Sequence, residues 1–205
     1  MLLGGAFSEA GVPGERIWPM ADTAHLDILF RGVDAWNQWR MENAVVPQFS
    51  GADLRRAKLK GANLLAAKLS ASDLRRAVLD RATLENADLF WADLSWANLV
   101  EPDLRSANIS MANLFASNLF GADLAGADLF GSRLSGSNLS RASFKDADLR
   151  YCDFDGALLH EADLSDADLS HAKSLTAEQL ESAGGNAGTR IPDGLPRPEH
   201  WFRAN

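Results

Sequence analysis

The sequence is poor in cysteine and has no long apolar run. Cys152 is the single cysteine among 205 residues, which excludes an internal disulfide framework. The first residues, MLLGGAFSEAG, lack the basic start and the longer apolar stretch of a secretory signal. No apolar run approaches the roughly 20 residues that a membrane-spanning helix needs. We therefore expect a soluble, cytoplasmic protein without a membrane span.

An excess of positive charge is also missing. The formal net charge is −8. Nucleic acids and anionic membranes attract basic surfaces, so we expect no direct nucleic-acid binding. The charge is unevenly spread, because residues 51–81 carry eight basic and three acidic side chains, whereas residues 82–170 carry five basic and fifteen acidic ones. The first part of this region is therefore basic and the rest is acidic.

A catalytic constellation is missing as well. No P-loop, dinucleotide fingerprint or nucleophile elbow occurs, and the four histidines are scattered along the chain. The many aspartates recur at fixed spacing on what we interpret as a solvated surface, where burial would not tune their pKa values for catalysis. We predict that the protein is not an enzyme and that it holds no cofactor and no metal.

The dominant feature that is present is a repeat of five residues between residues 51 and 170. Every fifth residue from Leu54 to Leu169 is large and apolar, which gives 24 positions without a skipped step. Twenty-one of them are leucine, and the others are Ile109, Phe144 and Phe154. Two residues before each of these positions stands a small residue, usually Ala or Ser, with Pro102 and Cys152 as the outliers. An internal repeat of this kind determines the architecture before local propensity does.

A period of five fits neither a helix of 3.6 residues per turn nor an alternating strand. It suits a chain that turns inward once every five residues, with the large side chain in the core and the small one where the backbone bends. The residue before each large apolar one is often Asp or Asn, as at Asp53, Asp93 and Asn113. Such short side chains bond to nearby backbone in Asx turns, so we interpret them first as a folding feature.

The pattern Ala-(Asp/Asn)-Leu followed by two further residues, as at Ala52-Asp53-Leu54 and Ala122-Asp123-Leu124, resembles the pentapeptide-repeat family. The resemblance covers about 120 of the 205 residues. It implies an all-β solenoid, a right-handed quadrilateral β-helix with four pentapeptides per coil and about six coils. At roughly 4.8 Å between coils, the rod would be on the order of 24 Å long.

Three segments follow from these patterns. Residues 1–50 form an N-terminal segment in which residues 1–21 are irregular and TAHLDILFRGVDAWNQWRMEN forms one capping helix with a Trp-rich apolar face, capped by Asp22 or Thr23. Residues 51–173 form the repeat β-helix. Residues 174–205 form a short helix, about 177–182, and an extended tail held by Leu195 and Trp201. This tail resembles the closing segment of bacterial family members, which implies a bacterial origin.

Outward-facing aromatic residues form the first candidate site. Clustered exposed aromatics mark contact surfaces, so we predict here either a partner surface or one covered by the chain's own termini. The same surface would serve a homodimer. The residues are Phe90, Trp91, Trp96, Met111, Phe115, Phe120, Phe130 and Tyr151. In the geometry that the family resemblance implies, residues 20 apart share a column, so Phe90 and Phe130 fall in one column and Trp91, Met111 and Tyr151 in the next. Phe120 falls on another face.

Basic residues at the beginning of the rod form the second candidate site. Either they form a solvated end whose charges pair with acidic residues of the N-terminal segment, or they form a docking site. The docking site would bind an acidic partner or the acidic end of another copy. The residues are Arg55, Arg56, Lys58, Lys60, Arg75 and Arg76.

Three functions fit these surfaces. The first is a non-enzymatic scaffold that binds a protein partner, which agrees with the large surfaces that repeat rods present. The second, implied by some family members, is a DNA mimic that protects DNA gyrase or a related topoisomerase; the acidic stretch favours it, and the basic first coils argue against it. The third is a subunit or assembly factor of a larger complex.

Overall fold

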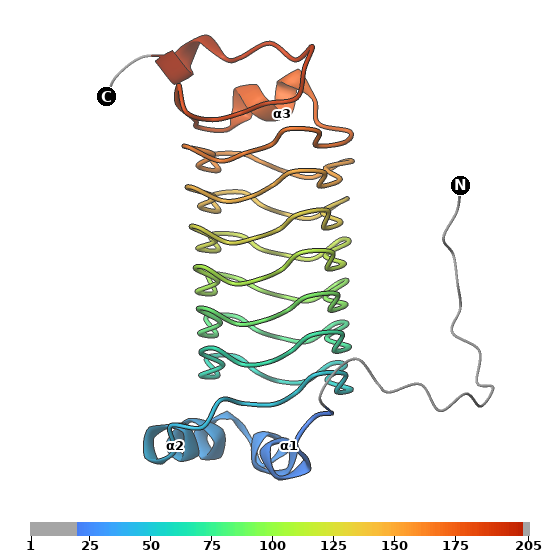
Figure 1. Ribbon diagram of the computed structural model, residues 1–205, viewed down its shortest axis with the longest axis vertical. Helices are drawn as coiled ribbons and strands as arrows, with labels where there is room; N and C mark the ends of the chain where they lie inside the picture. The colour runs from blue at the N-terminus through green and yellow to red at the C-terminus, as the bar shows by residue number, and fades with distance from the viewer. Residues whose placement is uncertain (1–19, 203–205) are drawn as a thin grey trace, which may run out of the picture.

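The protein is a rod of stacked coils with helices at both ends (Figure 1). The computed structural model describes residues 20–202. Each coil contains 20 residues, because residue i pairs in parallel with residue i+20 from Gln48 with Lys68 to Asp153 with Lys173. This span is the length of about six coils. The expected right-handed sense of the coil stays a prediction.

The pairing between coils is made of single-residue bridges, and residues 20–202 contain no extended strand. The bridging residue is the Asp or Asn position of each pentapeptide. The backbone turns immediately afterwards, with the next small residue donating to the carbonyl of the large one, as from Ala62 N to Leu59 O at 3.0 Å. The second residue of each turn has a positive φ, as in Trp91 at 60°. Each pentapeptide is therefore one side and one corner of a coil.

The interior follows the predicted pattern. All 24 large apolar residues from Leu54 to Leu169 are buried, and so is every small residue two places earlier except the half-buried Ala57. The core is thus a stack of leucine layers, with Phe144 and Phe154 in the last two regular coils. The predicted inside of the rod is confirmed.

The coil register begins one pentapeptide earlier than expected. Phe49, five residues before Leu54, is fully buried, and Pro47 occupies the small inward position before it. The first bridge is made by Gln48. We expected Pro47 to end the preceding pattern and the repeats to start at residue 51. The large residue at 49 keeps the period, so the boundary lies before it.

The N-terminal cap consists of two helices instead of the single one expected. Helix α1 spans Thr23–Phe30 and helix α2 spans Val33–Glu42. Gly32, with φ of 114°, separates them, because this backbone conformation is open to glycine alone and cannot continue a helix. Asp22 caps α1 through its side chain, as predicted. The expected apolar face is divided by the break, and Phe30 is exposed.

Helices α1 and α2 lie across the first coil (Figure 1). Trp36 is completely buried and donates from Nε1 to the carbonyl of Asn63 at 2.8 Å. Its ring stacks with that of Trp39 at 5.1 Å and meets Phe49 at 5.4 Å. Asn37 adds two bonds to the same coil, to Gly61 O and from Asn63 N. The cap therefore covers the core with Trp36 and satisfies free backbone groups of the coil edge.

The C-terminal end closes with helix α3, Ala177–Ser182, whose capping box at Thr176 and Gln179 is present as predicted. Gln179 also donates to the carbonyls of Phe154 and Ala157. The register of 20 ends here, since Asp163 pairs with Gly184 and Asp168 with Arg190. The tail is not fully extended, because a 3-10 turn, η1, spans Glu199–Phe202 and buries Trp201. The expected irregular segment of residues 1–21 lies almost entirely outside the described residues.

Candidate functional site

The eight residues of the candidate partner surface lie on three different corners of the rod. The corners follow from the 20-residue register. Five residues share one edge, which we call the aromatic corner. Trp96 and Phe115 lie on the next corner, and Phe120 lies on the one after that. The columns predicted for Phe90 with Phe130, and for Trp91, Met111 and Tyr151, are confirmed by this register, as is the separate face of Phe120. The aromatic corner consists of Phe90, Trp91, Met111, Phe130 and Tyr151.

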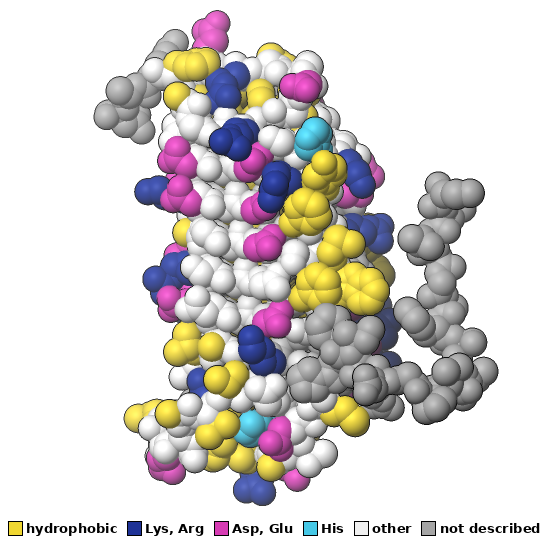
Figure 2. Space-filling model, viewed as in Figure 1, with side chains coloured by type: hydrophobic (Ala, Val, Ile, Leu, Met, Phe, Trp, Pro, Cys, Tyr) yellow, Lys and Arg dark blue, Asp and Glu magenta, His cyan; other side chains and the backbone are white. Residues whose placement is uncertain are grey.

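The aromatic corner is a continuous row along the rod axis. The rings of Phe90 and Trp91 stack at 6.2 Å, and those of Phe130 and Tyr151 lie 5.2 Å apart. Met111 lies between them, and a Cβ built on Gly131 would fall 2.8 Å from its sulfur. Glycine at this corner position thus leaves room for Met111. Figure 2 shows hydrophobic side chains gathered along one edge of the rod.

Three members of the row occupy a strained backbone position. Trp91, Met111 and Tyr151 have φ of 60°, 60° and 61°, a conformation that bulky residues rarely adopt. Their side chains are 52%, 46% and 41% exposed. Packing inside the protein therefore gains little from these large side chains at corners where glycine or asparagine is better suited.

His171 extends the row by one coil, and the sequence reasoning did not include it. Its ring stacks on that of Tyr151 at 4.9 Å. The signal was present, because residue 171 lies 20 residues after Tyr151 and so falls on the same corner. The aromatic corner therefore reaches the last regular coil.

The remaining three residues are held by arginines. The guanidinium of Arg133 lies 4.3 Å from the ring centre of Phe115, and that of Arg141 lies 5.7 Å from Phe120. Trp96 meets Phe115 edge-on at 5.4 Å. In these cation–π contacts, arginines of the same chain already occupy the faces of the aromatic rings. Phe115 and Phe120 are accordingly half-buried.

A column of acidic residues borders the aromatic corner. Asp88, Asp128, Asp148 and Asp168 belong to one bridge column, with Asn108 in between. Asp88 and Asp128 accept the backbone N–H of Phe90 and Phe130, which places their carboxylates beside the aromatic row. The predicted Asx bonds are confirmed here. Asp88, Asp148 and Asp168 form ion pairs with Lys68, Arg150 and Arg190, so Asp128 is the carboxylate of this column that has no ion pair among residues 20–202.

At the basic end, two of the six predicted residues are neutralised by their own repeat. Arg55 donates through Nε and Nη2 to Asp53 at 2.8 and 2.5 Å. Arg75 holds Asp73 in the same way, at 2.8 and 2.6 Å. We expected acidic partners from the N-terminal segment. The sequence Asp-Leu-Arg brings both charges to the same side of the turn. We call the resulting pair of hydrogen bonds from the guanidinium to the carboxylate a fork. The same fork forms at Arg105 and Arg150.

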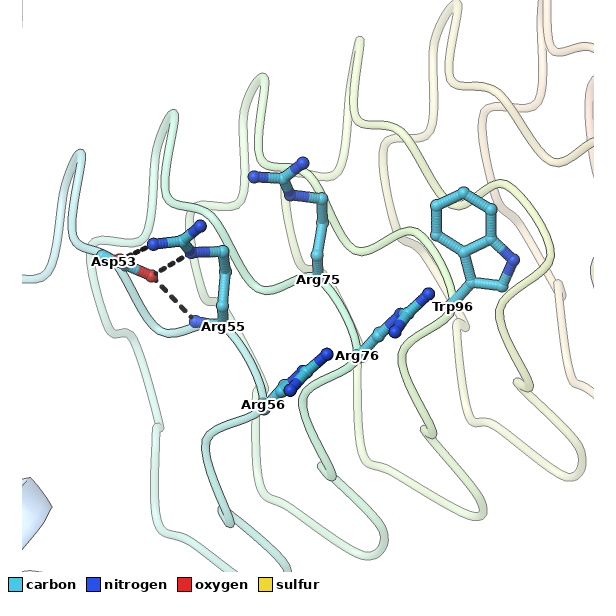
Figure 3. Close-up of a pocket in the computed structure, with 6 residues that line it drawn as sticks. All are labelled: Asp53, Arg55, Arg56, Arg75, Arg76 and Trp96. Carbon is cyan, nitrogen blue, oxygen red and sulfur yellow. Dashed lines mark hydrogen bonds and ion pairs between the residues drawn. The ribbon is translucent and has the colours of Figure 1, made fainter.

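The other four basic residues have no such partner. Within residues 20–202, no carboxylate forms an ion pair with Arg56, Lys58, Lys60 or Arg76. Lys58 and Lys60 lie on the neighbouring side of the rod. Arg56 and Arg76 line a hollow of about 480 Å³ together with Asp53, Arg55, Arg75 and Trp96 (Figure 3). We call it the arginine hollow.

The fork changes the acidity of its aspartate. The hydrogen bonds from Arg55 hold the pKa of Asp53 at about 2, below the ordinary 3.8. A depressed pKa in the folded state stabilises the protein above about pH 4, and this contribution is lost as the pH falls toward 2. We expect the Asp53 carboxyl carbon to titrate near pH 2 by NMR, and near pH 4 in the variant Arg55→Gln. Titration of the wild type near pH 4 would show that the fork does not form.

Two further features bear on possible chemistry, namely the buried thiol of Cys152 and the side chains that could hold a metal ion. Burial raises the pKa of the Cys152 thiol to about 12, and its Sγ lies 3.3 Å from the Ser132 hydroxyl and 3.0 Å from the Leu129 carbonyl. The thiol is therefore protonated and packed in the core. Residues 20–202 contain no group of three or more His, Cys, Asp or Glu side chains arranged to hold a metal ion. In the same range no helix has the length and apolar character of a transmembrane span.

Comparison with known proteins agrees with this architecture. The family model "Pentapeptide repeats (8 copies)" matches residues 48–86, 62–99, 97–136 and 137–173. A pentapeptide repeat protein from the Arabidopsis thaliana thylakoid lumen is 31% identical, with 58% of this chain and 68% of that chain covered and a TM-score of 0.44. Rfr23 from the cyanobacterium Cyanothece 51142 is 27% identical, with 58% and 66% covered and a TM-score of 0.39.

A more distant solved structure is QnrB1, a plasmid-mediated fluoroquinolone resistance protein. It is 20% identical, with 74% of this chain and 77% of that chain covered and a TM-score of 0.45. No curated protein matches the chain significantly. The family model covers more than half of the chain in the region where the coils are regular. The chain therefore belongs to the pentapeptide-repeat family.

Proposed function

We propose that the protein is a non-enzymatic scaffold whose aromatic corner binds a protein partner. The observation that carries the proposal is the row of Trp91, Met111, Phe130 and Tyr151, whose large apolar side chains are exposed at successive coils. Contiguous exposed apolar patches of this kind mark interaction sites. Aromatic side chains are also the residues that dominate binding energy at interfaces.

The rod suits such a role because its surface is already ordered. Each coil is bonded to the next through backbone groups, such as Met111 N to Phe130 O at 2.9 Å and Trp91 N to Ser110 O at 3.2 Å. Binding to a rigid surface loses little conformational entropy, so more of the contact energy appears as affinity. The strained corners at Trp91 and Tyr151 are consistent with side chains kept for contact.

The surroundings indicate the chemistry of the partner. The acidic column from Asp88 to Asp168 lies on one side of the aromatic corner, and Arg150 there is engaged in a fork with Asp148. A partner that buries the aromatic row brings its rim against these carboxylates. Because Asp128 is the carboxylate of this column without an ion pair among the described residues, the complementary surface is an apolar segment with a lysine or arginine opposite Asp128.

The DNA-mimic alternative receives less support from the geometry. It relies on outward carboxylates that form a free acidic surface. Asp123 and Asp163 instead accept the backbone N–H two residues ahead, at 3.1 and 2.9 Å, as Asp88 does. These aspartates recur because they stabilise the turns, so their number alone is no evidence of a surface shaped to mimic DNA.

The aromatic corner is tested by replacing Trp91 and Tyr151 with serine. We expect retention of the partner from a host extract to fall at least about tenfold, because interface aromatics contribute about 2 kcal/mol or more each. The matched control is Phe30→Ser with Leu158→Ser, which removes exposed apolar groups, one of them aromatic, from other parts of the protein. Quantitative affinity chromatography over the immobilised variants is the measurement.

Three outcomes distinguish the readings. Loss with the corner variant alone, followed by direct binding of the purified partner through an apolar and basic segment, supports the proposal. Equal retention by both variants contradicts it. A wild-type dimer that becomes a monomer with the corner variant, measured by light scattering, assigns the surface to a second copy of the chain and also contradicts a separate partner.

A further inference from the structure

The arginine hollow repeats its charges along the rod axis. Arg56 and Arg76 occupy the same corner in successive coils, and Trp96 occupies it in the third. Arg56 N donates to Arg75 O at 2.9 Å, and Arg76 N to Ser95 O at 3.1 Å, so the three positions are about 4.8 Å apart in turn. Figure 3 shows the two arginine side chains and the indole in one line.

The hollow combines two fixed and two unpaired guanidinium groups. The forks with Asp53 and Asp73 hold Arg55 and Arg75 in place and leave the Nη1 atom of each without a partner among the described residues. Arg56 forms no ion pair in that range, and Arg76 contacts only the face of Trp96, at 5.8 Å from the ring centre. The six lining residues include four cations and one anion, so the hollow carries a net positive charge.

This arrangement is unfavourable without a ligand. Two like charges one coil apart repel each other even in water. Carboxylates remove this repulsion and form short, charge-assisted hydrogen bonds with guanidinium groups. Because the forks are already ordered, an anion meets donors that are held in position.

The charge of the rest of the rod limits the length of the ligand. Residues 82–170 carry ten more acidic than basic side chains, so a long polyanion would be repelled beyond the third coil. A short acidic segment avoids this repulsion. The hollow ends at the exposed indole of Trp96, with Phe115 edge-on beside it, which offers a surface to one apolar residue.

We propose that the arginine hollow binds a short, extended acidic segment of a partner polypeptide. Its acidic side chains contact Arg56 and Arg76, and an apolar or aromatic residue that follows them packs on Trp96. The segment runs along the rod axis, in the direction in which the coils progress. This site lies on a different corner from the aromatic corner and does not depend on the function proposed for it.

The probe is a short fluorescein-labelled peptide with a run of glutamates followed by phenylalanine, and the measurement is fluorescence anisotropy with the full chain. The variant Arg56→Gln with Arg76→Gln is expected to lose at least about tenfold in affinity, since it removes charge-assisted hydrogen bonds to the acidic side chains of the peptide. Lys58→Gln with Lys60→Gln removes the same charge from the same end of the rod. It is expected to change the affinity less than about twofold.

Contact with Trp96 is tested by a double-mutant cycle. Trp96→Ala and replacement of the peptide phenylalanine by alanine should each weaken binding, and together they should do so by less than the product of the two factors. Trp91→Ser with Tyr151→Ser should leave peptide binding unchanged, so failure of one proposal is separate from failure of the other.

Several results would overturn the assignment. One is that the peptide does not bind, and another is that the arginine and lysine variants lose equal affinity for it. A third is that the Trp96 and peptide substitutions act independently in the double-mutant cycle. Tighter binding of a single-stranded oligonucleotide of equal charge would assign the hollow to nucleic acid instead. Self-association that disappears in the Arg56→Gln, Arg76→Gln variant would assign it to an acidic side of a second copy.

Discussion

Replacing Trp36 with alanine should lower the free energy of unfolding by about 3–5 kcal/mol, the usual loss for a buried aromatic residue. Trp36 is fully buried at the end of the core, against Phe49 and Trp39. The change also removes the donor to Asn63 O, which leaves a coil-edge carbonyl without its partner. Chemical denaturation measures the loss.

The position of Trp36 predicts where the damage appears. Each coil of a solenoid contacts only its neighbours, so loss of a terminal cap weakens the end first. Amide hydrogen exchange should accelerate in the coils that contain Asn63 and Leu69 and stay slow around Leu124. Phe30→Ala is the control, because Phe30 belongs to the same cap but is 62% exposed. Similar destabilisation by both variants would show that Trp36 does not seal the core.

Replacing Phe144 with alanine should also cost about 3–5 kcal/mol, here from the interior of the rod. Phe144 is completely buried in a layer where most positions are leucine, with Leu124 and Leu164 in the same column one coil away on either side. The alanine variant leaves a cavity that bonded coils cannot close, because their spacing is set by the backbone.

Phe144→Leu is the matched control for the cavity. It restores the residue that the repeat uses elsewhere and should cost less than about 1.5 kcal/mol, as volume-similar apolar exchanges do. Denaturant unfolding of the wild type, Phe144→Ala and Phe144→Leu measures the two losses in the free energy of unfolding. A leucine variant as unstable as the alanine variant would mean that the coil requires the ring itself and that the size of the cavity is not the cause.

The interior of the rod was predictable because one rule applies at every step. Each inward position has one coil above and one below, so the period of five is enough to identify Leu64 or Ala122 as buried. The same rule identifies Phe49, which keeps the period but was overlooked beside Pro47. Deviations in local backbone were harder to predict, because the break at Gly32 depends on a φ of 114° and glycine also occurs within helices.

The candidate sites were only partly predictable, because they depend on side-chain directions. Charge counting treats Arg55 and Arg56 alike, yet Arg55 turns back to Asp53 and Arg56 does not. For the aromatics, the spacing of 20 residues already separates Trp91, Met111 and Tyr151 from Phe120, and the observed register confirms these columns. Extending the same count beyond residue 170 adds His171 to the aromatic corner.

The register of 20 residues also governs which insertions and deletions the protein tolerates. Because four pentapeptides complete one coil, deletion of a single pentapeptide would keep every leucine inside but rotate all later coils by a quarter turn. Deletion of residues 101–105 would thus move Met111, Phe130 and Tyr151 one corner away from Trp91, with the core composition almost unchanged. Only length changes by whole coils preserve both the interior and the surface, so the spacing of contact residues can evolve in steps of 20 residues.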